Sequence, residues 1–175
     1  ACRYMYEYNN IKKKFNSCFR MCKNIDAVTD ITLLPVKKFN FDAAIIFSDI
    51  LIVLECLNIK VNFIKGKGPV VLNTNMYNIF KNRTNNIDFV KLNPVYESIK
   101  SVKKELHSLN KPLIGFSGAP WTIAAYMLEG NLTKDLSVAK TIVYKDPEFM
   151  SNVTYVLSDI IFKHIIQQID RGVDM

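Results

Sequence analysis

The sequence contains few of the residues that mark disulfide-bonded, metal-binding or membrane-spanning proteins. It has four cysteines and two histidines in 175 residues, and no apolar run approaches the roughly 18 residues of a membrane span. So few cysteines do not make a disulfide scaffold, which favours a reducing compartment. Cys18 and Cys22 lie one helical turn apart, like half of a metal site, but His107 and His164 occur in unrelated patterns. We therefore expect no metal and no transmembrane segment.

What the sequence does contain is apolar residues, at 49%, enough for a buried core, and a length that favours one domain. The net charge of +7 would suit nucleic acid, an anionic membrane surface or a polyanionic small molecule. A solvated lysine-rich surface is an equal explanation, because the Lys-, Asn- and Ile-rich composition is typical of an A/T-rich coding genome. Charge alone does not choose among these.

Apolar periodicity predicts alternating strands and helices. Residues 42–47 and 113–116 have the pattern of parallel strands, the first apolar on both faces, and residues 173–175 look like the first step of another. Residues 61–72 predict a hairpin that turns at Gly66 to Pro69. Helical spacing is found over residues 25–39, 94–109, 120–129, 136–143 and 147–171. This order favours a parallel sheet, either open and doubly wound or closed into a barrel.

Several residues are predicted to begin or end these helices. Asn24 is a capping residue for 25–39, within which Pro35 should bend or restart the helix, and Asn93 is a cap before Pro94. Gly130 and Gly172 are placed to end helices. His107 should be exposed, and His164 is interpreted as a satisfied histidine at the core margin. Residues 72–92, rich in asparagine, predict a surface connection.

Two sites carry candidate chemistry. Asp49 follows the strand at 42–47, so it would project at the strand's carboxyl end, where barrel enzymes build their sites. An equal interpretation is that Asp49 caps the segment after it. After the strand at 113–116, "GFSGAPWT" places small residues such as Gly118 where a bulky ligand could approach, and Tyr126 lies farther along the helix. Tyr126 could equally be a core residue with a satisfied hydroxyl.

The turn "GKGP" has proline where a phosphate loop needs N–H groups, which disfavours nucleotide binding.

Three blocks of sequence resemble the uroporphyrinogen decarboxylase family. "GFSGAPWTIAAYMLEG" is similar nearly residue for residue to a family signature, "RYMYEY" resembles the family's "GRYLPEY", and "FDAAIIFSDILIVLECLNIKVNFIKGKGP" resembles the family's next block. The blocks occur in the family's order and span almost the whole chain except residues 72–92. The resemblance implies an α/β fold, a TIM-type (β/α)8 barrel of which residues 1–175 are an incomplete single domain, roughly the first half.

The family's activity is then the expected function. The resemblance implies conversion of uroporphyrinogen III to coproporphyrinogen III in haem and porphyrin biosynthesis, by removal of four acetate carboxyls as CO2. It also implies a homodimer that uses no metal or organic cofactor. We expect no nucleic-acid partner and no membrane span. The substrate carries eight carboxylates, which would give the positive net charge a use. A pyrrole protonated at its α-carbon accepts the electrons that CO2 leaves behind, so the protein must supply a proton and stabilise a cation.

The matching positions suggest roles for individual residues. Asp49 matches the aspartate that accepts pyrrole N–H groups and stabilises the cation, and Arg3 matches an arginine that contacts substrate carboxylates. Tyr126 matches a tyrosine that lines the cleft. The remaining candidates contact substrate through a backbone, a point charge or a lining surface: Ala1, Lys12, Ile45, Phe47 and Gly118.

The chain also departs from the family. Cys2, Tyr6, Asn9 and Lys12 stand where glycine, proline and two arginines are usual; a lysine at position 12 can pair with a carboxylate, but not bidentately. The family's upstream arginine, a favoured general acid, and its later serine and histidine would lie outside residues 1–175. We therefore expect a longer natural protein, with this chain inactive alone.

Two other functions stay open. A corrinoid-dependent methyltransferase would share the barrel, and its zinc ligands would lie mostly beyond residue 175. A non-catalytic tetrapyrrole-binding relative, or an inactive fragment, would explain the departures around Arg3. The compartment is expected to be the cytoplasm or a plastid, and no targeting segment is recognised in this sequence.

Overall fold

The computed structural model describes residues 2–64, 66–72, 76–81, 87–131 and 133–175. The chain divides into two compact units. The first contains the residues up to Ile52, Leu92–Phe116 and His164–Met175, and the second contains Val53–Lys91 and Ser117–Lys163.

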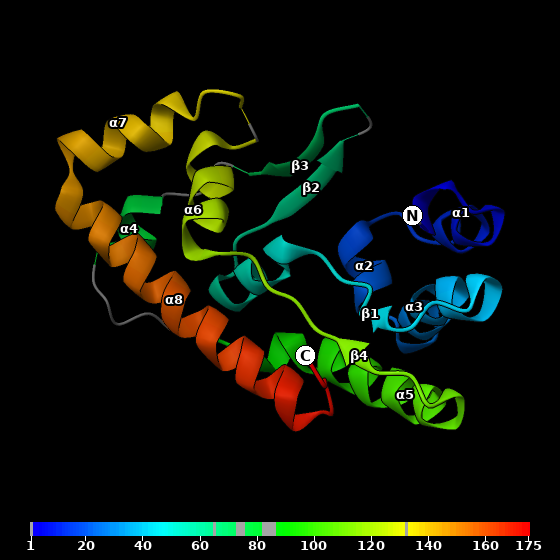
Figure 1. Ribbon diagram of the computed structural model, residues 1–175. Coiled ribbons are helices and arrows are strands. Elements are labelled where there is room, and N and C mark those ends of the chain that lie inside the picture. The colour runs from blue at the N-terminus through cyan, green and yellow to red at the C-terminus, as the bar shows by residue number, and fades with distance from the viewer. Residues whose placement is uncertain (1, 65, 73–75, 82–86, 132) are drawn as a thin grey trace. The chain divides into compact units, whose positions relative to one another are not determined.

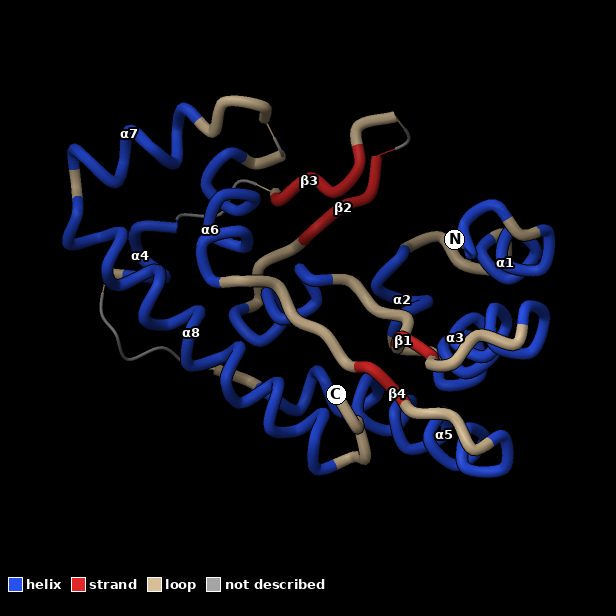
Figure 2. The backbone as a smooth tube through the Cα atoms, viewed as in Figure 1, coloured by secondary structure: helices blue, strands red, loops and turns tan. Residues whose placement is uncertain are grey.

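The first unit is built on parallel strand pairing (Figures 1 and 2). Strand β1 (Ala44–Ile45) pairs with β4 (Leu113–Ile114) in parallel, and Ile46 N–H extends the pairing with a 2.9 Å bond to Ile114 O. Strand β4 also bonds to the last residues of the chain: Asp174 N–H donates to Leu113 O at 2.9 Å, and Gly115 N–H donates to Met175 O at 2.8 Å. Residues 173–175 therefore run alongside β4 in the same direction, as the predicted start of another strand would, but they do not form a strand in the structure.

Two helices pack on each other and on these strands. Helix α3 (Ile25–Phe39) contacts β1, and α5 (Asn93–Leu109) contacts β4. Helix α3 begins as predicted, because the Asn24 side chain accepts the N–H of Ala27 at 2.8 Å, and Pro35 lies inside it without ending it. The apolar stripe predicted for α5 is buried at Val95, Ile99, Val102 and Leu106.

Two expectations about this unit were wrong. Asn93 does not cap α5: it is already helical, Leu92 is the capping residue, and no side-chain capping bond is made. The strand at β1 is not buried on both faces, since Ile45 is 60% exposed while Ala44 and Ile46 are buried. Helix α3 contacts this strand, and because side chains alternate along a strand, Ile45 points away from the face that holds Ala44 and Ile46.

A buried polar pair joins α5 to the end of α8 (Pro147–Asp170). The Tyr96 hydroxyl lies 3.1 Å from His164 Nδ1, and both side chains are buried. Burial lowers the pKa of His164 to about 4. The interpretation of His164 as a satisfied core histidine is confirmed, and His107 is exposed as expected.

The second unit contains the predicted hairpin and most of the remaining helices. Strands β2 (Val61–Ile64) and β3 (Gly68–Val71) pair in antiparallel fashion, with Gly66 and Gly68 both at φ +84°, which favours glycine. Helix α6 (Pro120–Glu129) ends at Gly130 with φ 75°, as the sequence predicted. Helix α7 (Ser137–Lys145) comes next, and α8 opens with Asp146 accepting the N–H of Phe149 at 3.0 Å.

Within residues 72–92 the structure describes two short helical segments, α4 (Met76–Phe80) and the 3-10 helix η3 (Phe89–Leu92). Phe80 and Leu92 are fully buried anchors. Residues 73–75 and 82–86 of the predicted asparagine-rich connection lie outside the described residues.

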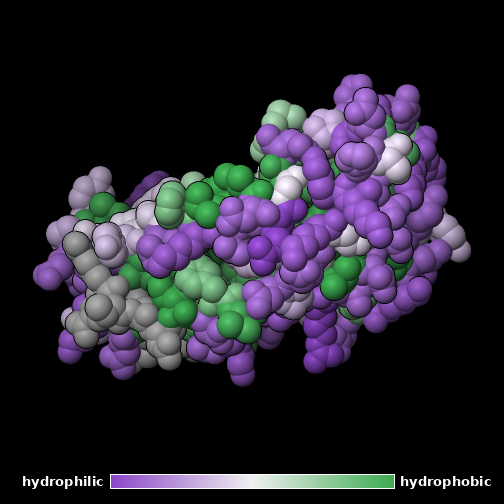
Figure 3. Space-filling view, turned by 90° about the horizontal axis from the view of Figure 1, so that it is seen from below, coloured by the Kyte–Doolittle hydropathy of each residue, from purple (hydrophilic) through white to green (hydrophobic). Residues whose placement is uncertain are grey.

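The described helices include none that is both long and apolar enough to cross a membrane. Apolar side chains nevertheless reach the surface between polar ones (Figure 3). On α8, Phe162 is 63% and Ile169 is 55% exposed.

Candidate active site

Asp49 lies four residues beyond the end of β1 and immediately before the 3-10 helix η2 (Ile50–Leu57). Its Oδ1 accepts the N–H of Leu51 at 2.9 Å, so the carboxylate does cap the start of η2. Burial raises the pKa of Asp49 above its usual range, although the Leu51 N–H and the positive charge of Arg3 both lower it. Capping and chemistry are therefore compatible, because the capping bond fixes the orientation of a carboxylate that remains desolvated.

The residue before Asp49 adds a polar group that the sequence reasoning missed. Among the described residues, the Ser48 hydroxyl is buried without a hydrogen-bond partner. Buried hydroxyl groups normally have a partner, so this one is available to a bound ligand or water. Only its position beside Asp49 could have suggested it from the sequence.

Arg3 and Lys12 belong to the N-terminal segment of the first unit. Arg3 lies in the 3-10 helix η1 (Cys2–Tyr4) and is exposed, and Lys12 is exposed at the last residue of α1 (Tyr6–Lys12). A lysine at that place is also favoured by the partial negative charge of the helix end. Ala1, the other substrate-contact candidate of this segment, lies outside the described residues.

Phe47 and Ile45 are placed differently along the strand. The ring of Phe47 meets the ring of Tyr8 edge to face with centroids 6.0 Å apart, and its N–H donates to the Thr32 hydroxyl at 3.0 Å. Phe47 is half-buried against α1 and therefore ties the end of β1 to that helix. Ile45 offers the exposed apolar surface noted above.

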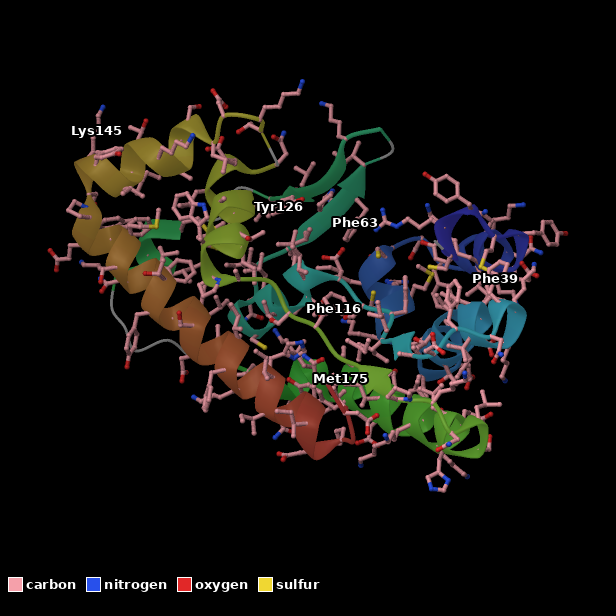
Figure 4. All side chains as sticks on the ribbon, in the orientation of Figure 1. Phe39, Phe63, Phe116, Tyr126, Lys145 and Met175 are labelled. Carbon is pink, nitrogen blue, oxygen red and sulfur yellow. The ribbon has the colours of Figure 1, made fainter. Side chains whose placement is uncertain are left out.

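Tyr126 and Gly118 belong to the second unit. Tyr126 projects half-buried from α6 (Figure 4), and Gly118 is buried just before that helix. Helix α6 is held to β3 by a 2.7 Å bond from Val71 N–H to Gly130 O. The first unit thus contains Arg3, Lys12, Ile45, Phe47 and Asp49, and the second contains Gly118 and Tyr126.

A pair of thiols lies within the electrostatic reach of the first group. Cys18 and Cys22 are the two ends of α2 (Cys18–Cys22), with Sγ atoms 4.0 Å apart. The charges of Arg3, Lys12 and Asp49 all act on Cys18. Across the described ranges, no group of three or more His, Cys, Asp or Glu side chains is arranged to hold a metal ion.

A pocket of about 920 Å³ lies in the second unit, lined mainly by apolar side chains that include Met76 and Phe149. Its two carboxylates already have structural partners. Glu129 accepts the N–H of Ala139 at 2.9 Å and the Thr133 hydroxyl at 3.0 Å, and Asp146 caps α8. These contacts leave the pocket without an evident catalytic group.

Comparison with known proteins agrees with the resemblance found in the sequence. A family model for uroporphyrinogen decarboxylase matches residues 1–175. Uroporphyrinogen decarboxylases of Brucella anthropi and Brucella ovis are each 37% identical over 174 residues, which is 99% of this chain and 50% of theirs. The chain therefore spans about half the length of these curated relatives.

A solved structure supports the fold. A methyltransferase from Methanosarcina mazei superposes with a TM-score of 0.70 over 94% of this chain and 48% of its own, at 12% sequence identity. Such low identity shows the fold alone. The superposition confirms an α/β fold in which the chain forms part of a TIM-type barrel. Together with the family match along its whole length, this shows that the chain belongs to the uroporphyrinogen decarboxylase family.

Proposed function

We propose that the protein carrying this chain is a carboxy-lyase that converts uroporphyrinogen III to coproporphyrinogen III with no metal or organic cofactor. Family membership over residues 1–175 supports the reaction class. The observation that carries the proposal is Asp49, a half-buried carboxylate of raised pKa four residues beyond the end of the parallel strand β1. In barrel enzymes this end of the strands forms the active site.

Asp49 is suited to stabilise a cationic intermediate. Its carboxylate can accept hydrogen bonds from pyrrole N–H groups while the ring is protonated and CO2 leaves. Because Asp49 is desolvated, its attraction to a developing positive charge is stronger than in water. The capping bond to Leu51 holds the group in place, so little reorganisation is needed as the charge appears.

The other candidates would bind the substrate. Arg3 and Lys12 are exposed cations that can pair with its carboxylates, Lys12 as a point charge only. Tyr126 supplies a hydroxyl, and the backbone of Ala1 would approach the macrocycle. Apolar or close-approach surface comes from Ile45, Phe47 and Gly118.

The organisation of the complete protein belongs to the same proposal. Residues 1–175 form one incomplete barrel domain, with residues 72–92 as a surface connection, in a homodimer of the cytoplasm or a plastid. A longer chain supplies the general acid, which lies outside these residues. Support for this comes from the relatives, of which the chain spans about half.

The test is anaerobic release of CO2 from uroporphyrinogen III by the full-length protein, compared with Asp49→Asn. Asp42→Asn is a matched control, because Asp42 is exposed just before β1. We expect turnover by the parent and the control, and a severe loss of rate with little loss of substrate binding in Asp49→Asn. Equal rates in all three would remove Asp49 from this role. Binding without turnover by the parent would instead identify a tetrapyrrole-binding relative.

A further inference from the structure

Helix α2 carries a thiol at each end, and the two thiols touch. Cys18 and Cys22 share a hydrogen bond with 4.0 Å between the Sγ atoms. Cys18 is half-buried and Cys22 is fully buried. A reagent from solvent can therefore reach Cys18 first, with a second sulfur directly behind it.

The surroundings of Cys18 favour its reactive form. The hydrogen bond from Cys22 lowers the pKa of Cys18, and the positive charges of Arg3 and Lys12 lower it further, against burial and the charge of Asp49. A thiolate is the form of cysteine that attacks electrophiles. Cys18 is thus a better nucleophile than an ordinary buried thiol.

The backbone between the two residues permits a covalent bond. Residues four apart in an α-helix have Cα atoms about 6 Å apart, which is inside the range of about 4.4–6.8 Å that disulfides span. Closure requires the Sγ atoms to approach from 4.0 Å to bonding distance. Side-chain rotation with a small adjustment of the five-residue helix α2 supplies this movement.

We propose that Cys18 and Cys22 form a reversible oxidation site, in which Cys18 reacts with a peroxide and Cys22 closes a disulfide. The Cys18 thiolate attacks one oxygen of hydrogen peroxide, so that an S–O bond forms, the O–O bond breaks and hydroxide leaves. Cys22 sulfur then attacks the Cys18 sulfenic acid. The S–S bond forms, the S–O bond breaks and water leaves with the Cys22 proton. The two thiols lose two electrons to the peroxide.

The other two cysteines differ from Cys18 in ways that the site explains. Cys56 is fully buried, and burial raises its pKa to about 12, so it should stay reduced. Cys2 is half-buried against the same apolar cluster as Cys18, and it is the competing partner for a disulfide. The inference goes beyond the proposed function and its readout is thiol chemistry, so it can fail while the decarboxylase proposal stands.

The experiment treats the reduced protein with hydrogen peroxide, blocks remaining thiols and maps tryptic peptides by mass. Cleavage after Arg20 separates the two cysteines, so a disulfide joins two peptides that dithiothreitol releases. We expect this pair in the parent and in the Cys56→Ser control, and its loss in Cys18→Ser. Cys22→Ser should leave a Cys18 sulfenic acid that dimedone traps.

A second measurement needs no variant. Limiting iodoacetamide on the native parent protein should label Cys18 before Cys2 and Cys56. A disulfide between Cys18 and Cys2, or unchanged peroxide-driven loss of thiols in Cys18→Ser, would overturn the proposal. So would preferential labelling of Cys56.

Discussion

Asp174 lies alongside β4 and Asp49 lies beyond the end of β1, and their surroundings shift their pKa values in opposite directions. Asp174 Oδ2 accepts the N–H of Leu113 at 2.7 Å and Lys103 Nζ at 2.5 Å. The Leu113 N–H and then Lys103 lower the pKa of Asp174. Burial raises the pKa of Asp49, which has one backbone donor at Oδ1. The Asp174 carboxylate is thus held by donors from β4 and α5, whereas the Asp49 carboxylate is desolvated.

The difference shows that burial and the number of hydrogen-bond donors, and not proximity to the strands, decide the direction in which the pKa of each carboxylate moves. Several donors stabilise the charged form and lower the pKa, whereas desolvation penalises the charged form. Asp174 should therefore contribute to stability at neutral pH, and Asp49 should reduce it. This contrast can be tested at both residues.

The largest effect is expected on catalysis in the full-length protein. On the role proposed for Asp49, Asp49→Asn should reduce the rate of CO2 release from uroporphyrinogen III by about 10²–10³-fold, because a neutral acceptor cannot balance the developing cation. Asp174→Asn should keep the parent rate per folded molecule. Equal losses in the two variants would break the comparison.

The next largest effect is a loss of stability in acid through His164. This loss would mask the smaller pH-dependent contributions of Asp49 and Asp174 in an unfolding experiment. The pKa of His164 falls from 6.5 to about 4 on folding, so the unfolded chain binds more protons between these values and stability falls as pH decreases through this window. The difference corresponds to about 3 kcal/mol of unfolding free energy. Urea unfolding at a series of pH values measures it.

A double variant, Tyr96→Phe with His164→Leu, removes both members of the buried pair and avoids an unpaired hydroxyl. The part of the acid slope above pH 4 that belongs to His164 should disappear in it. A slope identical to the parent's would assign the acid sensitivity to other groups.

A smaller loss is expected when Asp174 is neutralised. Asp174→Asn should lower the free energy of unfolding by about 1 kcal/mol at neutral pH, a modest value because Lys103 and Asp174 are partly exposed. The folded-state pKa is below 3.8, so the contribution is present above that value and is lost as pH falls through the folded pKa. Lys103→Met in a double-mutant cycle isolates the ion pair; additive losses would contradict the assigned contact.

The smallest effect has the opposite sign. Burial raises the folded-state pKa of Asp49 above 3.8. The contribution of Asp49 to stability therefore declines as pH rises from 3.8 through the folded-state pKa, and it stays unfavourable at neutral pH. Asp49→Asn should therefore raise the unfolding free energy slightly at pH 7, with the gain vanishing in acid. Destabilisation at pH 7 in the urea titration would show that the capping bond outweighs desolvation.

Local features of the fold were predicted well from the sequence. The Asn24 cap, the hairpin at Gly66 to Gly68 and the end of α6 at Gly130 depend on residues within a few positions of each other. The Asn93 cap failed because the chain enters α5 one residue earlier than its side chain suggested. The exposed Ile45 failed because burial of a strand face depends on elements distant in sequence.

The candidate site divides in the same way. The sequence by itself determined the family, the alternation of strands and helices and the choice of Asp49 and Arg3, because these rest on order and spacing along the chain. Only the tertiary structure decided that Asp49 is desolvated while Asp174 is charged and fastened, and that Cys18 lies near both Arg3 and Asp49. Desolvation and charge–charge interactions depend on distance in space, so residues far apart in the sequence set them.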